Sequence, residues 1–220
     1  MKKFKIFKQK IKSIRGNSLA EFAVTTAMMA TLATTAAPRF SGIGEGAKEK
    51  KTMAEIDKIV TSASNFFNDK VTVEGRGRFP GQEKYTVPIG GYIKESSLLS
   101  VIGEEADDQT AFDEYSHPEG AQWRSVFGFR GSNIPTDGSQ VIEDNEGNIK
   151  GHEEFLDGFA NNPIPSGYQD GHFIYVVIPG GTEYVNIDGN EIEVECNTCS
   201  PILYVADLEN PAKLFKKYQP

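Results

Sequence analysis

The residues with the clearest chemical signal lie near the N-terminus, where Gly16 and Asn17 are followed by Glu21. Glu21 directly precedes an uncharged run, 22–37, and the segment 1–16 carries seven lysine and arginine residues and no acid. A basic flank before an apolar segment is typical of membrane targeting with the N-terminus in the cytoplasm. A carboxylate inside a membrane costs about 2.5–3.5 kcal/mol at mid-depth and is usually paired. We therefore expect a processing site here and a partner for the Glu21 carboxylate.

An ordinary secretory signal would instead end its apolar region at a small-residue cleavage site, which residues 34–37 could provide. That alternative leaves Glu21 without a role. The apolar run ends in the sequence APRFSG at residues 37–42. Pro38 in this sequence removes a backbone donor and clashes with the preceding turn, so it predicts a kink or local melting of a helix.

These features together resemble class III prepilins, the family of the type IV pilins and of the pseudopilins of type II secretion. The resemblance rests on Gly16 at the end of a basic leader, Glu21 at the fifth position after it, the apolar run, and the proline-arginine-phenylalanine junction. It implies that a membrane-bound prepilin peptidase cuts after Gly16 and N-methylates Asn17. It also implies that Glu21 contacts the terminal amine of a neighbouring subunit during assembly.

The resemblance further implies where the protein acts and with what. Its partners would be copies of itself in a helical filament, other pilins or pseudopilins, the prepilin peptidase and an inner-membrane assembly platform. The chain would cross the inner membrane once, with the head outside the cytoplasm, before joining a periplasmic pseudopilus or a cell-surface pilus.

Two features bear on the subfamily. Asn17 stands where the family usually has phenylalanine at the new terminus. The order RGNSLAEFA at residues 15–23 also resembles the pseudopilins of tight-adherence systems, whereas the proline-arginine-phenylalanine order at 38–40 favours the type II or type IVa side. The subfamily therefore stays open between these alternatives.

The expected fold class is α+β and pilin-like, with a long N-terminal helix, membrane-spanning in its first half, packed on an antiparallel sheet. We expect a cleaved leader at 1–16, a hydrophobic helix at 17–40, an amphipathic continuation at 41–69 and a globular head at 70–220. Threonine and alanine in the first helix favour close helix packing. Three glycines weaken the junction between the two halves, each by about 1 kcal/mol relative to alanine: Gly42, Gly44 and Gly46.

Helical spacing of apolar residues predicts that the second half of the helix packs against the head and ends near Asn68. The stripe consists of Met53, Ile56, Ile59, Val60, Ala63, Phe66 and Phe67. Beyond it, short apolar runs separated by turns predict strands at 71–73, 85–87, 126–129, 172–178, 191–195 and 202–206. We also expect a hairpin about Asp188-Gly189, a short helix at 96–102 capped by Ser96 or Ser97, and a sheet edge closed by Tyr204, Phe215 and Tyr218.

One segment offers oxygen ligands for a cation. Asp144, Glu146 and Asn148 surround a glycine, which resembles a calcium loop, and the family resemblance includes calcium in the C-terminal loops of major pseudopilins. The spacing lacks the terminal glutamate of an EF-hand, and a solvated hairpin turn is the alternative. We expect no required cofactor, with calcium as the one candidate.

The two cysteines of the chain, Cys196 and Cys199, are separated by two residues. In an oxidising compartment such a pair predicts one disulfide flanking a turn. Redox catalysis and metal binding are the alternatives, but the first usually needs a thioredoxin-like setting and the second needs further ligands. Haem attachment is excluded by the motif because Ser200 follows Cys199.

Composition bears on the remaining function classes. Removal of the leader takes the formal net charge from −8 to −15, so direct nucleic-acid binding is disfavoured. The three histidines show no paired spacing and no nucleophile, phosphate-loop or zinc-protease motif is present, so we expect no enzyme. The aromatic residues are expected in the core of the head: Trp123, Phe127, Phe129, Tyr168, Phe173 and Tyr175.

The sequence thus predicts a structural subunit that polymerises from the inner membrane. The alternative is a monomeric, membrane-anchored extracytoplasmic protein that binds calcium, glycan or another protein. The two hypotheses differ in what they require of Glu21, because only assembly needs its carboxylate.

Overall fold

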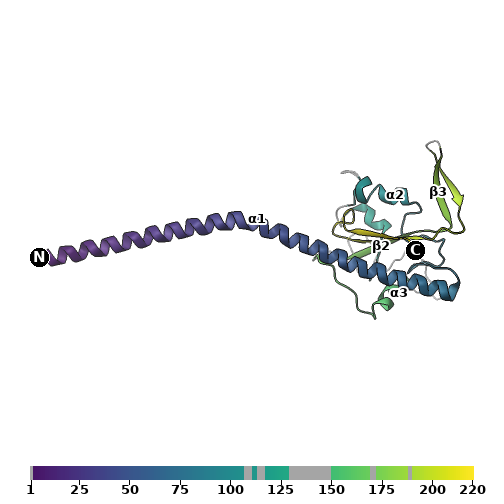
Figure 1. The fold of residues 1–220 in the computed structure, drawn as a ribbon, viewed down its shortest axis with the longest axis horizontal. Coiled ribbons are helices and arrows are strands. Elements are labelled where there is room, and N and C mark those ends of the chain that lie inside the picture. Colours follow the sequence, from purple (N-terminus) through teal and green to yellow (C-terminus); the bar gives the residue numbers. More distant parts are fainter. Residues whose placement is uncertain (1, 107–110, 113–116, 129–149, 169–171, 188–189) are drawn as a thin grey trace. The chain divides into compact units, whose positions relative to one another are not determined.

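The computed structural model of the chain combines helices with antiparallel sheet, which confirms the α+β class. It forms two compact units, Met1–Ala47 and Lys48–Pro220. Helix α1 (Lys2–Glu74) contributes to both units (Figure 1). The structure describes all residues except 1, 107–110, 113–116, 129–149, 169–171 and 188–189.

Helix α1 continues across the junction at Pro38, where the sequence predicted either a kink or local melting. Residues 38–46 are helical, so the local melting predicted at Pro38 is not present. Proline removes a single hydrogen bond from the helix, and the remaining bonds on both sides preserve it.

The helix also ends later than predicted, at Glu74 instead of Asn68. Thr72 donates its hydroxyl to the carbonyl of Asn68 at 3.1 Å, within the helix. Gly75 follows with a φ of +76°, a left-handed conformation that glycine adopts without strain, and its N–H donates to the carbonyl of Val71. The strand predicted at 71–73 is therefore wrong.

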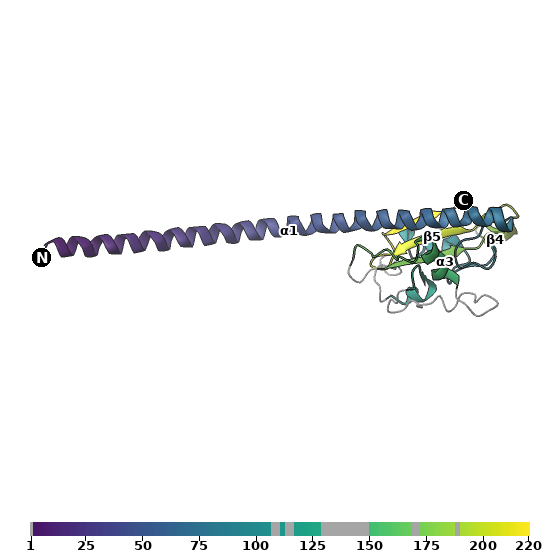
Figure 2. The ribbon, with the colours of Figure 1, turned by 90° about the horizontal axis from the view of Figure 1, so that it is seen from below.

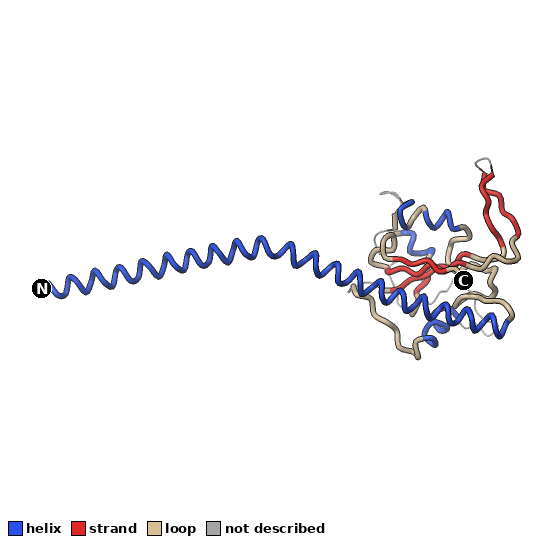
Figure 3. Tube along the Cα trace, viewed as in Figure 1, coloured by secondary structure: helices blue, strands red, loops and turns tan. Residues whose placement is uncertain are grey.

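The main sheet has four antiparallel strands in the order β1-β2-β5-β6 (Figure 3). They are β1 (Arg124–Ser125), β2 (Phe173–Ile178), β5 (Ile202–Asp207) and β6 (Phe215–Tyr218). The predicted strands at 172–178 and 202–206 are confirmed, as is the closure of one sheet edge by the C-terminal segment.

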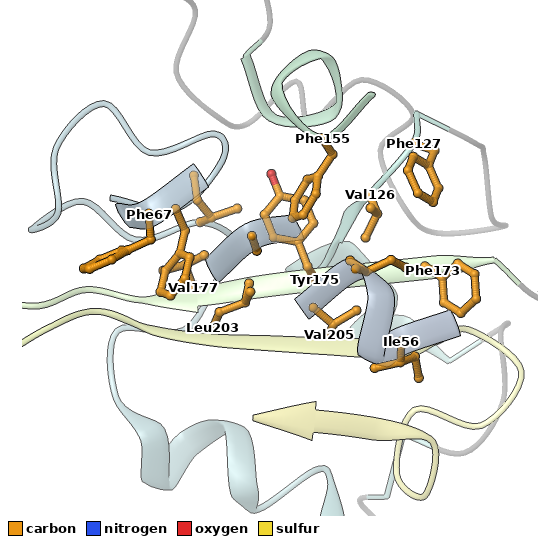
Figure 4. Close-up of a cluster of buried hydrophobic side chains, with 14 residues drawn as sticks. Ile56, Phe67, Val126, Phe127, Phe155, Phe173, Tyr175, Val177, Leu203 and Val205 are labelled. Carbon is orange, nitrogen blue, oxygen red and sulfur yellow. The ribbon is translucent and has the colours of Figure 1, made fainter. Parts of the chain in front are cut away.

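Both faces of the sheet are covered, because successive side chains of β2 enter two separate cores. Phe173, Tyr175 and Val177 point to the first core, which α1 covers with residues of the predicted stripe (Figures 2 and 4). There the ring of Phe155, from α3 (Lys150–Gly158), lies edge-on to that of Tyr175 at 4.9 Å between ring centroids. The first core also includes Ile56, Ile59, Ala63, Phe67, Phe79, Ile89, Val126, Phe127, Leu203 and Val205.

The second core lies on the other face of the sheet, against α2 (Glu95–Leu99). Trp123 is fully buried there and packs against Phe112 and Tyr92. Two short 3-10 helices, η1 (Gly103–Glu105) and η2 (Pro118–Gln122), frame this side.

Trp123, Phe127, Phe173 and Tyr175 are buried as predicted, Tyr168 is half-buried, and Phe129 lies outside the described residues. The predicted cap of α2 is wrong, because Lys94 precedes the helix and makes no side-chain cap.

Two further strand predictions are wrong. Residues 85–87 form a turn, because the side-chain amide of Gln82 donates to the carbonyls of Tyr85 and Val87. Residues 126–128 bend directly after β1, and Gly128 there has a φ of +77°. By contrast, β3 (Thr182–Ile187) and β4 (Asn190–Glu195) pair as the predicted hairpin, separate from the main sheet (Figure 1).

Candidate functional site

The residues of the predicted processing and assembly site all fall on helix α1. The backbone of Gly16, Asn17, Glu21 and Pro38 is helical, and their side chains lie outside the described residues. Asn17 and Glu21 are separated by four positions, which in a helix places two residues on the same face, one turn apart. For this site the structure therefore describes the backbone of the predicted residues and the side chains of some residues directly after Glu21.

The described side chains directly after Glu21 expose large apolar groups around the helix. Phe22, Val24 and Met29 are 68%, 53% and 69% exposed. Large apolar side chains exposed together commonly mark a surface that a partner or a lipid phase covers.

The threonines in the same turns do not make this surface polar. Thr26 lies within hydrogen-bond distance of two carbonyls of its own helix, those of Phe22 at 2.8 Å and Ala23 at 3.0 Å. Thr25 donates to the carbonyl of Phe22 at 2.9 Å. A hydroxyl that is satisfied within its own helix can enter an apolar environment without losing a hydrogen bond.

Among the residues that the structure describes, no helix combines the length and the apolar character needed to cross a membrane.

The cysteine pair closes a turn between β4 and β5. Cys196 and Cys199 are joined as a disulfide with an S–S distance of 2.01 Å. Backbone hydrogen bonds fix the same turn to the start of the hairpin, from Gly181 N–H to the Cys199 carbonyl at 3.0 Å and from Cys196 N–H to the Gly181 carbonyl at 2.9 Å. The Arg76 guanidinium donates to the Asn197 carbonyl at 2.7 Å and connects the turn to the end of α1. Three kinds of interaction thus hold the base of the hairpin: the disulfide, the backbone hydrogen bonds of Gly181 and the hydrogen bond from Arg76.

The hairpin that rises from this base is apolar on one face. Val185 lies opposite Ile192, and strand alternation places Ile187 and Val194 on the same side. These four β-branched side chains are between 38% and 51% exposed. We refer to this surface as the hairpin face.

The other side of the hairpin borders a cavity of about 420 Å³ next to α2. The ammonium group of Lys94 lies over the ring of Tyr184, 4.4 Å from its centroid. Glu183 and both cysteines bring a carboxylate oxygen and two sulfur atoms within 4.8 Å of one another. Because the sulfurs are bonded to each other, they are not available as thiolate ligands.

The candidate calcium ligands Asp144, Glu146 and Asn148 lie outside the described residues.

The histidines are dispersed, as the sequence indicated. His117 accepts a hydrogen bond from the backbone N–H of Glu119, and His152 lies in α3. His172 precedes β2, and burial lowers its pKa to about 4.

Comparison with family models, with curated proteins and with solved structures gives no match.

Sequence reasoning missed the exposure of the hairpin face. Part of the signal was present, because apolar and polar residues alternate strictly at 191–195, after the predicted turn at Asp188-Gly189, whereas the adjacent Tyr184 and Val185 interrupt the alternation before it. Nothing in that pattern distinguished a covered side from an open one.

Proposed function

We propose that this protein is a pilin-like structural subunit, which polymerises through its N-terminal helix into a filament assembled at the inner membrane. The single observation that carries the proposal is the exposed apolar surface of α1 after Glu21, with threonine hydroxyls satisfied within the helix. Such a surface suits either lipid or neighbouring helices.

The proposed mechanism requires no catalysis by this chain. After the peptidase cuts behind Gly16, the new amine at Asn17 carries a positive charge, and the carboxylate of Glu21 on a neighbouring subunit neutralises it. Pairing two charges in an apolar environment lowers the cost that each charge alone would have there. Because the pair forms only at one axial offset, it sets the register between subunits.

The remaining properties of the chain are compatible with this role. The mature chain carries a net charge of −15, which favours solvent-exposed heads around an apolar filament centre. Head-to-tail contacts between identical subunits generate open helical arrays. We propose either a periplasmic pseudopilus or a cell-surface pilus as the product, with an inner-membrane assembly platform and prepilin peptidase as partners.

A second candidate function is favoured by the cavity beside α2. Its lining includes Lys94, Glu95 and Tyr184, which could recognise a polar ligand. In that case the chain would be an anchored, monomeric binding protein. Such a protein would not need the Glu21 carboxylate.

The test is replacement of Glu21 by alanine in the full-length chain, expressed with its prepilin peptidase and assembly system. We expect loss of sheared or sedimenting filaments, while the disulfide and protease resistance of the head remain. Glu45→Ala is the matched control, because Glu45 is an exposed carboxylate on the same helix outside the apolar run. Filament yield unaffected by Glu21→Ala would contradict the proposed assembly mechanism and favour the binding protein.

A further inference from the structure

The hairpin face is both apolar and set in an acidic segment. Residues 182–195 contain five acidic residues and no lysine or arginine. One of them, Glu183, is exposed and lies directly opposite Val194 on the hairpin face, whereas strand alternation places Glu193 and Glu195 on the other side of the hairpin. Exposed strands of this kind are normally covered, because they otherwise promote uncontrolled association. A suitable cover would be apolar at its centre and basic at its rim.

The same chain carries a surface of that description. A groove of about 550 Å³ lies between α1 and the segment before β6. Its apolar lining consists of Met53, Ala54 and Leu214, and Lys50 and Lys213 contribute two ammonium groups. We refer to it as the α1–β6 groove.

Two acids also line the groove, and one of them is neutralised. Asp57 forms an ion pair with Lys216 of β6, whereas Glu49 is exposed. Including Lys216, three basic and two acidic side chains therefore surround the apolar lining. The net sign is opposite to that of the hairpin.

The two surfaces lie near different ends of the part of α1 that belongs to the second unit. The groove includes Asp57 of α1, whereas the hairpin base is bonded to Arg76, just beyond the end of the helix at Glu74. At a rise of 1.5 Å per residue, Asp57 and Glu74 are about 25 Å apart along the helix. A chain therefore cannot place its own hairpin in its own groove.

We propose that the hairpin face of one copy docks in the α1–β6 groove of the next copy. The proposal rests on the proposed function, because it names the contact between heads of neighbouring filament subunits. The contact joins two different surfaces, so it repeats without closing on a dimer. Pairing of two hairpins is disfavoured, because it would bring two segments of five acids each together.

The test is thiol cross-linking in the full-length chain during assembly. Val185→Cys places a thiol on the hairpin face and Ala54→Cys places one in the groove, and both positions are exposed. With a short bismaleimide, the double variant should form a ladder of cross-linked dimers and larger species, whereas neither single variant should form cross-linked species. The native cysteines are bonded to each other and do not compete.

Charge reversal provides an independent readout. Lys50→Glu together with Lys213→Glu should lower ladder formation at least fivefold, because it makes the rim acidic. Lys84→Glu is the matched control, since Lys84 is an exposed lysine outside the groove. Equal ladders in the reversed and control variants would overturn the proposal.

The outcomes separate this inference from the proposed function. Filaments without a ladder in the double variant would overturn the contact and leave the filament role intact. A ladder without Glu21-dependent filaments would support the contact and contradict the filament mechanism. Cross-linking of the Val185→Cys single variant would mean that hairpins pair with each other, and absence of both ladder and filaments would remove both proposals.

Discussion

Arg78 and Glu154 form a two-bond ion pair that joins the segment after α1 to helix α3. The two terminal guanidinium nitrogens donate to the two carboxylate oxygens at 3.0 and 2.9 Å. The same carboxylate accepts the backbone N–H of Gly81 at 2.7 Å, and Glu74 accepts the third guanidinium donor. Burial opposes the charge on Arg78, but its hydrogen bonds and ion pairs with Glu154 and Glu74 outweigh burial and raise its pKa.

Breaking this pair should destabilise the head strongly. The Arg78 side chain is only 9% exposed, so Glu154→Gln would remove the two-bond counterion of a largely buried charge and leave only Glu74 paired with it. We expect a loss of about 3 kcal/mol in the free energy of unfolding, measured by denaturant titration of the detergent-solubilised chain. Lys58→Gln is the control, because it breaks an ion pair in which Lys58 is 60% exposed, and should cost no more than about 0.5 kcal/mol. Equal losses in the two variants would contradict this account of the pair.

Removal of the disulfide should loosen the hairpin base. The bond closes a short loop, and chain entropy alone assigns it a stabilisation of roughly 2 kcal/mol. Cys196→Ser with Cys199→Ser should therefore lower the melting temperature and make the segment around β3 and β4 more sensitive to limited proteolysis. A reductant should produce the same change in the native chain and none in the double variant. Unchanged proteolysis of the hairpin in the double variant would mean that the hydrogen bonds of Gly181 suffice.

The threonine hydroxyls of α1 should be dispensable for assembly. Thr25 and Thr26 donate to carbonyls of their own helix, so replacement of both by valine removes no contact with another subunit. We expect filament yield within about twofold of the native level by shear fractionation, whereas Thr26→Lys should abolish assembly because it buries an unpaired charge. Loss of filaments in the valine variant would indicate that these hydroxyls bond between helices.

Acid should destabilise the head through His172. Its folded pKa of about 4 lies below the ordinary value of 6.5, so the unfolded chain binds the proton more readily. Stability from this group is complete above pH 6.5, falls as the pH decreases towards 4, and is lost below that value. Asp207, whose pKa burial raises, acts in the opposite sense near its own titration.

The measurement is the free energy of unfolding between pH 4 and 6.5 for the native chain and for His172→Gln. The variant should show a shallower loss of stability in this interval. Identical slopes would mean that other groups determine the acid sensitivity of the head.

Sequence reasoning was most successful where local pattern and tertiary packing agree. The run FIYVVI of β2 is apolar at every position because both faces of the strand are buried. The spacing of Ile56, Ile59, Ala63 and Phe67 likewise matches a helix with one buried face. In these two elements the sequence pattern that predicts the secondary structure is also the pattern of side chains that the buried faces need.

The failures have particular physical causes. Val71 to Val73 have high strand propensity, but Glu74 accepts ion pairs from Lys70 and Arg78 that hold the last turn of the helix. Tyr85 is held in a turn by Gln82 and by the guanidinium of Arg76, which lies 4.4 Å from its ring centroid. Such contacts depend on side chains that propensity does not consider.

The candidate site was predictable only in its N-terminal part. Gly16, Asn17 and Glu21 stand out because the glycine ends a basic segment and the glutamate directly precedes an uncharged, largely apolar run. The groove could not be predicted, because Ala54 and Leu214 are distant in the sequence and meet only through the packing of β6 beside α1.

The central claim is that the chain is processed at Gly16 and assembles through the terminus so released. Intact mass and N-terminal peptide mass spectrometry, on protein made together with its prepilin peptidase, test it most directly. We predict a mature chain that begins with N-methylated Asn17. A retained leader, or a terminus near Ala37, would contradict the claim, because neither places a free amine where Glu21 of a neighbouring subunit could pair with it.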